Sequence, residues 1–269
     1  MGIFSSLFSI NRRHLFEIED QSWLPKSLRN GVTDFLQHIV QVYSLYQPIT
    51  DRLFKALYNT NQSHIIDLCS GGSGPWVSLA KKLPKENKGK FSITLTDLYP
   101  NQMAICRSSK LKMGNIKYLS DSVNALQVPK ELKGFRTLFS SFHHLNPTQA
   151  QSVLQNAVEA KSGIAIFEST QRHPLTIIYM LLTPFIVMIN TPFIRPFRWS
   201  RIFWTYCIPL IPLVVAFDGI ISCLRTYSVD ELKEMTQKVD APNYHWEIGL
   251  EKIGYLPIGV TYLIGYEKT

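Results

Sequence analysis

The 269-residue chain has few of the residues that build disulfide-stabilised or zinc-binding proteins. It contains only four cysteines, which are widely spaced and include no C-x-x-C pair: Cys69, Cys106, Cys207 and Cys223. This spacing gives neither a disulfide framework nor a metal site, so we predict a reducing compartment and no bound metal. The N-terminus also lacks the basic start and long apolar core of a secretory signal. We therefore expect the globular part to stay in the cytoplasm.

Charged residues are scarce as well, and acids are the minority among them. They make up 18% of the chain, and 28 Lys and Arg against 20 Asp and Glu give a formal charge of +8. A basic balance suits anionic membranes or nucleic acids. Because the basic residues flank apolar segments and form no dense patch with interleaved aromatics, we expect a membrane and no nucleic acid. Residues 1–6 match the myristoylation pattern, which we interpret as a chance match to a short motif.

The most informative stretch is a short apolar run that ends on an acid and then breaks into glycines. It covers residues 64–76 and reads HIIDLCSGGSGPW. A buried strand requires the apolar run, and a tight turn that brings backbone close to a ligand requires residues without a Cβ. Pro75 has a fixed φ that suits the first turn of a helix. We predict a strand, a binding loop and a helix start whose exposed amides favour an anionic or strongly polar group.

Further strands are predicted to end on chemically active side chains. From residue 63 the chain alternates strand and helix patterns, which is typical of a parallel sheet. Strands over 91–97, 116–119, 135–142 and 163–168 lead to Asp97, to Asp121, to the pair His143 and His144, and to Glu168. The carboxyl ends of parallel strands meet at one edge of a sheet, so these side chains are expected to lie with Asp67 around one site. Asp97 is placed to accept hydrogen bonds from ribose hydroxyls.

The order of these residues resembles that of the class I S-adenosylmethionine-dependent methyltransferases. The resemblance rests on Asp67-x-Cys69-x-Gly71-Gly72, followed by the acids and histidines at the later strand ends. It implies S-adenosyl-L-methionine as the cofactor, held by Asp67, Cys69, Gly71 and Gly72 in the loop, by Asp97 at the ribose, and by Asp121 and Ser122 at the adenine, with Leu98 as a further cofactor contact. Cys69 stands where the family usually has the first loop glycine. The competing dinucleotide fingerprint fails, because residues 71–74 do not supply the register G-x-G-x-x-G.

The residues at the strand ends suggest roles in methyl transfer. An oxygen acceptor needs a base, and His143 or His144 is the candidate for a base or substrate contact. The alternative is structural, with one ring stacking on its neighbours and the other capping the next helix. No third histidine or carboxylate lies nearby at helical spacing, so we predict no zinc site. Glu168 and Trp23 are candidate substrate contacts, and Glu168 can equally pair with Arg172.

Two long apolar runs follow the fifth predicted strand. No charged residue occurs from 174 to 194, and a second apolar run covers 202–217. Arg195, Arg198 and Arg201 alternate with aromatic residues between them, as at a lipid headgroup interface. Each run is close to the length that spans a membrane, but prolines interrupt both. Three interpretations stay open: a transmembrane hairpin, an amphiphilic subdomain lying on a membrane, or a lid that covers a hydrophobic molecule or a dimer interface.

The two ends of the chain complete the predicted fold. Apolar residues at helical spacing over 33–46 predict an N-terminal helix, and a second, short helix is expected over 49–58. Near the C-terminus, the sequence from Ser228 to Glu231 predicts a capping box, and two strand-like runs at 244–251 and 260–266 predict a hairpin. We therefore predict an α/β fold with a seven-stranded, Rossmann-like methyltransferase sheet whose last strand is antiparallel. N-terminal helices and an apolar helical insertion after strand 5 accompany this sheet.

These observations lead to one predicted organisation and function. The expected parts are an N-terminal arm or lid over 1–60, a cofactor-binding domain over 61–172 and 224–269, and a hydrophobic insertion over 173–223. The expected activity is S-adenosylmethionine-dependent methylation of a hydrophobic or lipid-like small molecule. It is placed at the cytoplasmic face of a membrane that the protein meets through 174–218, or in the cytoplasm as the alternative. The competing function is an inactive, membrane-associated binding or assembly factor with the same fold.

Overall fold

A computed structural model of the chain describes residues 10–82, 91–110, 115–253 and 258–268. The myristoylation pattern at 1–6 lies outside the described residues. Internal contacts divide the chain into two compact units. The helical unit comprises Met1–Tyr43 and Thr170–Tyr227, and the sheet unit comprises Ser44–Ser169 and Ser228–Thr269. Each unit is therefore assembled from two separate segments of the chain.

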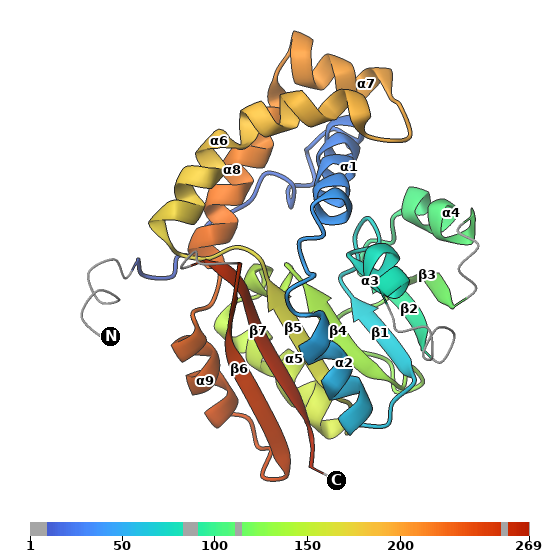
Figure 1. The fold of residues 1–269 in the computed structure, drawn as a ribbon, viewed down its shortest axis with the longest axis vertical. Coiled ribbons are helices and arrows are strands. Elements are labelled where there is room, and N and C mark those ends of the chain that lie inside the picture. The colour runs from blue at the N-terminus through green and yellow to red at the C-terminus, as the bar shows by residue number, and fades with distance from the viewer. Residues whose placement is uncertain (1–9, 83–90, 111–114, 254–257, 269) are drawn as a thin grey trace. The chain divides into compact units, whose positions relative to one another are not determined.

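The sheet unit contains a single seven-stranded sheet in the order β3-β2-β1-β4-β5-β7-β6 (Figure 1). Strands β1 to β5 run parallel, whereas β7 pairs antiparallel with both β5 and β6. The strands are β1 (His64–Leu68), β2 (Ser92–Asp97), β3 (Ile116–Ser122), β4 (Phe135–Phe139), β5 (Ile164–Glu168), β6 (Tyr244–Lys252) and β7 (Gly259–Glu267). This arrangement confirms the predicted sheet and its antiparallel last strand.

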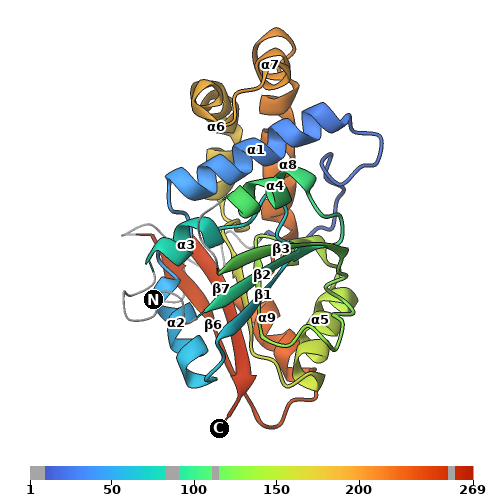
Figure 2. The ribbon, with the colours of Figure 1, turned by 90° about the vertical axis from the view of Figure 1, so that its right-hand side faces the viewer.

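Helices cover both faces of this sheet (Figure 2). Helices α2 (Thr50–Asn59) and α3 (Trp76–Lys82) lie on one face, and α5 (Pro147–Glu159) and α9 (Val229–Gln237) lie on the other. Helix α4 (Gln102–Lys110) follows β2. Capping boxes begin two of these helices, one from Asn146 and Gln149 and the other from Ser228 and Glu231. The second of them is the box that the sequence predicts.

Helix α2 belongs to the sheet unit through ion pairs with the C-terminal hairpin. Arg52 pairs with Glu247 and with Glu251 of β6, and its guanidinium lies 4.4 Å from the centre of the Tyr262 ring. The boundary between the two units falls between Tyr43 and Ser44.

The helical unit is built on three longer helices. These are α1 (Lys26–Val42), α6 (Pro174–Asn190) and α8 (Leu210–Arg225), with the short elements η3 (Thr191–Phe193), α7 (Trp199–Ile202) and η4 (Phe203–Cys207). The short element η2 (Phe142–His144) belongs to the sheet unit. Helix α1 begins directly after Pro25, earlier than the expected residue 33, and the Pro25 carbonyl accepts the N–H of Arg29 at 3.0 Å as the first helical hydrogen bond. The apolar core of the helical unit joins α1 to α6 and α8 through Leu28, Val32, Phe35, Val187, Ile211, Val214 and Val215.

Candidate functional site

The loop after β1 has an unusual backbone that brings it within reach of a ligand. Four of its residues have positive φ angles: Cys69 at 57°, Gly71 at 48°, Ser73 at 109° and Gly74 at 54°. Glycine accepts these angles freely, but Cys69 and Ser73 hold them at a cost on the order of 1 kcal/mol each. A Cβ added at Gly71 would meet nothing within 4 Å, whereas one at Gly74 would lie 3.3 Å from Asp67 Oδ2. Gly71 therefore borders open space, and Gly74 packs against β1.

The carboxylate of Asp67 lies inside the protein and holds the start of the loop. Its Oδ1 accepts a hydrogen bond from Thr137 Oγ1 at 2.7 Å, and its Oδ2 accepts one from Ser70 Oγ at 2.6 Å. Burial raises the pKa of Asp67 to about 6 although both hydroxyls favour the charged form. The sequence analysis missed Thr137, whose only signal was its position level with Asp67 on the neighbouring strand β4. Asp67 thus joins β1, β4 and the loop.

Asp97 connects the end of β2 to the same loop. Its Oδ2 accepts the N–H of Gly71 at 2.8 Å, and its Oδ1 accepts the N–H of Tyr99 at 2.8 Å. Asp97 is half-buried, and this burial raises the pKa of its carboxyl group. The β2–β3 register shifts between Leu95 and Asp97, so that Asp97 lies opposite Ser122. The acid expected at the ribose is therefore next to the glycine loop.

Two further predicted residues lie beside Asp97, at the end of β3. Ser122 Oγ donates a hydrogen bond to the carbonyl of Leu98 at 2.6 Å, and Leu98 itself is exposed. Asp121 precedes Ser122 in β3 and is also exposed. The structure therefore brings Gly71, Asp97, Leu98 and Ser122 together, with Asp121 adjacent in the chain.

The remaining loop residues are held from behind by β2 and β3. Ser70 N–H donates to the carbonyl of Thr96 at 2.9 Å, and the Tyr118 hydroxyl donates to the carbonyl of Gly71 at 2.9 Å. Tyr118 was another residue that the sequence analysis missed. Cys69 and Gly72 are half-buried in this loop, and burial raises the pKa of the Cys69 thiol to about 12. Cys69 is therefore an uncharged thiol at neutral pH.

The carboxyl ends of β1 and β2 and the loop after β1 have the features that a polar ligand with hydroxyl groups requires. The Ser73 hydroxyl is buried and has no hydrogen-bond partner among the described residues. Gly71 borders open space, and the Asp97 carboxylate next to it is only half-buried. A carboxylate has about four lone-pair positions, so Asp97 retains acceptor capacity beyond its two backbone partners. These residues fit a nucleoside-type cofactor of the kind that the sequence resemblance implies.

His143 forms a buried pair with Glu168 at the ends of β4 and β5. His143 Nδ1 lies 2.6 Å from Glu168 Oε2, and both side chains are buried. Glu168 Oε1 accepts the N–H of Phe142 at 2.8 Å and that of His143 at 3.3 Å. The ring of His144 is half-buried, and its centre lies 4.4 Å from that of His143. Glu168, which the sequence analysis considered as a substrate contact, is thus directed at a histidine.

A chain of hydroxyl groups lies at the same strand ends. The Tyr46 hydroxyl is 2.6 Å from Ser140 Oγ, which in turn is 2.8 Å from Ser169 Oγ. Tyr46 is buried, and desolvation raises the pKa of its phenol. Nothing in the sequence pattern marked these residues, because hydroxyl groups are common in turns. Trp23, the other candidate substrate contact, lies in the helical unit with 66% of its surface exposed, and its role stays a prediction.

Comparison with known proteins identifies the fold. No protein-family model matches the chain, and no curated protein matches it in sequence. The structure of the plantazolicin methyltransferase BpumL in complex with SAH is similar, with a TM-score of 0.58 at 9% identity over 93% of this chain and 94% of that one. Human N-acetylserotonin methyltransferase (ASMT) in complex with SAM has a TM-score of 0.50 at 12% identity, over 90% and 56%.

A third solved structure matches to a similar degree but has a different description. It is a putative Zn-dependent alcohol dehydrogenase from Rhodobacter sphaeroides, with a TM-score of 0.50 at 12% identity over 89% of this chain and 98% of that one. At identities this low, the structural similarity shows the fold alone. The chain has the class I S-adenosylmethionine-dependent methyltransferase fold, in agreement with the sequence resemblance.

Proposed function

We propose that the protein is an S-adenosylmethionine-dependent methyltransferase that acts on a hydrophobic small molecule at the cytoplasmic face of a membrane. The observation that carries this proposal is the 2.8 Å hydrogen bond from the Gly71 N–H to Asp97 Oδ2. It places a half-buried acid beside a loop whose backbone borders open space. The similar BpumL and human ASMT structures were solved with SAH and SAM, which supports this choice of cofactor.

The residues of the loop and the neighbouring strand ends divide the binding of the cofactor among them. Cys69, Gly71 and Gly72 would lie along its methionine and adenosine parts, and Asp97 would accept hydrogen bonds from the ribose. Asp121, Ser122 and Leu98 would border the adenine. When bound, S-adenosylmethionine supplies an electrophilic methyl group. The chain's own task is to position an acceptor beside that group and to exclude water.

His143 and Glu168 provide a base for an acceptor hydroxyl. The Glu168 carboxylate accepts a hydrogen bond from Nδ1, which selects the tautomer whose basic nitrogen is Nε2. Nε2 would take the proton of the acceptor hydroxyl, and Glu168 would stabilise the resulting imidazolium. Since Glu168 also accepts two backbone N–H groups, its own position is fixed before substrate binds. This division makes His143 the proposed base and Glu168 a positioning residue.

The hydrophobic character of the acceptor is inferred from the helical unit. Its helix α6 contains no charged residue, and large apolar side chains are exposed along it. Soluble monomers rarely expose contiguous apolar patches of this kind unless the patch meets a membrane, a partner or a ligand. An enzyme that rests on a membrane has direct access to molecules dissolved in it.

Calorimetry tests the cofactor. We expect the purified full chain to bind S-adenosylmethionine with a micromolar dissociation constant, and Asp97→Ala to weaken binding at least about tenfold, because a charge-assisted hydrogen bond is lost. The matched control is Asp240→Ala, which removes an exposed acid from elsewhere in the sheet unit and should bind as the unmodified chain does. No binding heat and no thermal stabilisation with the unmodified chain would sink the proposal and favour an inactive binding factor.

The reaction has its own test. The chain is incubated with S-adenosylmethionine carrying a radioactive methyl group and with an organic extract of cell membranes. We expect label to enter the organic phase, and His143→Ala to reduce the rate about a hundredfold. Label in water-soluble products alone would contradict the hydrophobic acceptor while leaving the cofactor assignment intact.

A further inference from the structure

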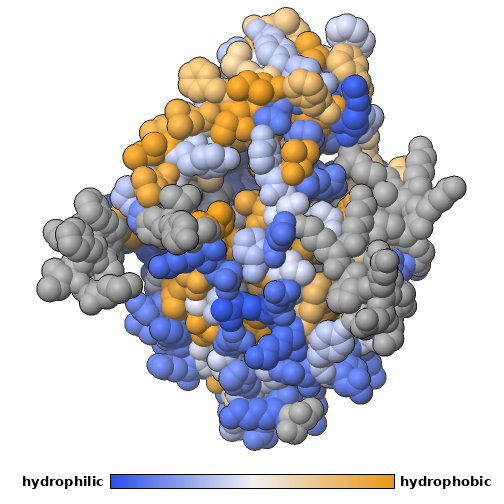
Figure 3. Space-filling model, in the orientation of Figure 1, coloured by the Kyte–Doolittle hydropathy of each residue, from blue (hydrophilic) through white to orange (hydrophobic). Residues whose placement is uncertain are grey.

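Helix α6 buries polar side chains and exposes apolar ones, which is the reverse of a helix in an ordinary soluble protein. Its buried positions include the polar residues Thr176, Thr183 and Asn190, with Val187 the one apolar residue among them. The exposed positions are apolar: Leu175, Ile178, Tyr179, Leu181, Leu182, Phe185, Met188 and Ile189. Figure 3 shows the hydrophobic surface that runs along α6. We name these eight side chains the outer face of α6.

Two of the three inward polar side chains of α6 have hydrogen-bond partners, whereas the buried Thr176 hydroxyl has none among the described residues. Thr183 Oγ1 donates to the carbonyl of Met180 at 2.6 Å, and Asn190 Nδ2 donates to the carbonyl of Ile186 at 2.9 Å. Asn190 Oδ1 also lies 3.3 Å from Nε2 of His38 on α1. The bonds to Met180 and Ile186 lie within α6 itself, whereas the contact with His38 joins α6 to α1 and would be lost if α6 rotated to hide the outer face. This contact and the burial of Val187 in the apolar core therefore favour the outward orientation of the apolar residues.

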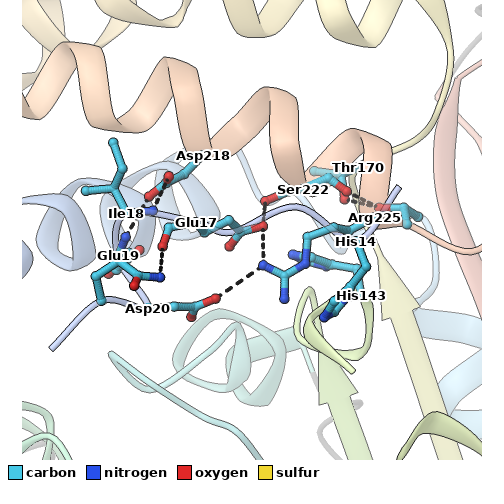
Figure 4. Close-up of polar contacts among 12 residues, drawn as sticks. His14, Glu17, Ile18, Glu19, Asp20, His143, Thr170, Asp218, Ser222 and Arg225 are labelled. Atoms are coloured by element: carbon cyan, nitrogen blue, oxygen red, sulfur yellow. Dashed lines mark hydrogen bonds and ion pairs between the residues drawn. The ribbon is translucent and has the colours of Figure 1, made fainter. Parts of the chain in front are cut away.

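The opposite side of the unit is charged. Within α8, Asp218 accepts the N–H groups of Ile18 at 2.7 Å and Glu19 at 2.9 Å (Figure 4). Near the end of α8, Arg225 pairs with Glu17 at 3.3 Å and with Asp20 at 3.2 Å. A lipid environment on this side would have to accommodate several charges and an irregular backbone segment, which is costly. The helical unit therefore has one side suited to lipid and one suited to water.

Aromatic side chains and an arginine extend the outer face at its C-terminal end. Phe193, Phe197 and Trp199 are exposed, with Trp199 at 78%, and Arg195 between them is exposed too. We name these four residues the tip. Arg201 fixes the tip's backbone, since its guanidinium donates to the carbonyls of Ile194 at 2.7 Å and Pro196 at 2.8 Å. Exposed aromatics beside arginine are typical of the boundary between lipid tails and headgroups.

We propose that the helical unit docks in the plane of an anionic membrane, with the outer face of α6 and the tip entering the headgroup boundary and no segment crossing the bilayer. This proposal specifies the membrane contact included in the proposed function. From 173 to 224 the only acid is Asp218, which is buried, so the charge on the docking side is positive. Anionic lipid is therefore the complementary surface.

The geometry favours in-plane docking over a membrane-spanning hairpin. Among the described residues, one helix, Pro174–Phe193, is long and apolar enough to cross a membrane, with 28% of it buried. The second apolar run forms no straight partner for it, because Trp199–Cys207 and Leu210–Arg225 meet at 77°. The C-terminal half of helix α8 is also attached to the charged segment from Glu17 to Asp20. A monotopic arrangement satisfies both sides of the unit at once.

Vesicle flotation of the full chain tests the docking surface. We expect the chain to float with vesicles of phosphatidylcholine and phosphatidylglycerol, and weakly with phosphatidylcholine alone. The double variant Phe185→Gln with Ile189→Gln removes two side chains of the outer face and should weaken binding at least about tenfold. The matched control is Tyr58→Gln with Ile253→Gln, which removes two exposed apolar side chains of the sheet unit and should leave flotation unchanged. Arg195→Glu should weaken binding to the anionic vesicles alone.

The depth of Trp199 separates in-plane docking from spanning. Fluorescence that is lost in Trp199→Phe should be quenched more strongly by lipids brominated near the headgroup than by lipids brominated near the chain ends. Deep quenching would overturn the proposal. Unchanged flotation of the double variant would overturn it too, as would a dimer in solution that this variant dissociates, because a second copy would then cover the outer face. Calorimetric binding of S-adenosylmethionine is measured on every variant, so failure of the docking proposal is distinguishable from failure of the enzyme proposal.

Discussion

Glu168 and His143 are a buried pair in which a carboxylate oxygen lies 2.6 Å from an imidazole Nδ1, while the other carboxylate oxygen accepts two backbone N–H groups. One acid therefore fixes both the ring of His143 and the backbone that carries it. The arrangement separates the two functions of Glu168, because a substitution can preserve the backbone contacts and still change the histidine.

Glu168→Gln is expected to fold and to lose activity. The amide oxygen can keep the two N–H groups, but its NH₂ group would face Nδ1 and favour the tautomer with the proton on Nε2. We expect the rate of methyl transfer to the extracted acceptor to fall between tenfold and a thousandfold with little change in KM. The nitrogen-15 shifts of the His143 ring would report the exchanged tautomer. Glu168→Ala is the comparison, and should cost on the order of 3 kcal/mol in urea unfolding because buried donors lose their acceptor. An active Glu168→Gln enzyme with an unchanged tautomer would contradict the positioning role.

Asp67→Asn should change stability in a pH-dependent manner. The pKa of Asp67 is raised to about 6 in the folded protein from an ordinary value of 3.8. The folded state therefore keeps a proton that the unfolded state releases, and folding stability falls as pH rises through this window. Above pH 6 the folded protein carries Asp67 as a buried charge, which lowers the free energy of unfolding. Asp67→Asn removes this charge, so it should stabilise the cofactor-free protein by on the order of 2 kcal/mol at pH 8 and by almost nothing near pH 3.5. Urea unfolding at both values tests this, and an equal effect at the two would count against burial as the cause.

Ser73→Gly should stabilise the cofactor-free protein. The serine combines a φ of 109° with a buried hydroxyl that has no partner among the described residues. Removing both features should gain about 1–2 kcal/mol after the entropy cost of glycine. The control is Ser70→Gly, which removes the hydroxyl that donates to Asp67 and should destabilise instead. A lower urea midpoint for Ser73→Gly would show that this hydroxyl has a partner in solution.

Arg201→Ala should destabilise the helical unit. Arg201 is buried, pairs with Asp34 at 2.7 Å and donates to the carbonyls of Ile194 and Pro196, on either side of Arg195. Removing it leaves a buried carboxylate less compensated, at a cost of about 3 kcal/mol. Hydrogen exchange of the backbone amides in α1 and α8 should become faster. The control is Arg195→Ala, which changes an exposed residue and should leave the exchange of these amides unchanged. Protection that stays the same in Arg201→Ala would contradict the assigned role.

The sequence predicted the sheet and its polar edge because each strand carries its own evidence. Apolar runs that end at Asp67, Asp97 and Glu168 are local patterns, and parallel topology then brings their ends together. The pairing of Glu168 with His143 had no such signal, since the two residues come from different strands and the direction of a side chain at a strand end depends on the turn that follows. The same holds for Thr137, whose side chain reaches Asp67 from β4, and for Tyr118, whose hydroxyl reaches the Gly71 carbonyl from β3.

The orientation of α6 was also beyond the sequence. The helix contains so few polar residues that its periodicity shows no polar face, and the apolar residues alone do not predict which side α8 covers. Packing decides it, because Val187 joins the apolar core with α1 and α8 and Asn190 contacts His38 of α1. Three interpretations of the apolar insertion were open for this reason.

The two-segment construction of each unit has a consequence for the order in which the chain folds during synthesis. The apolar side of α1 is completed by α8, and the position between β5 and β6 is filled by β7, which follows β6 in the chain. Neither unit can complete its core until distant parts of the chain have been synthesised. A ribosome-bound chain that ends before α8 therefore exposes the apolar side of α1 to its surroundings. Chaperone dependence during synthesis, and sensitivity to C-terminal truncation in both units, follow from this topology.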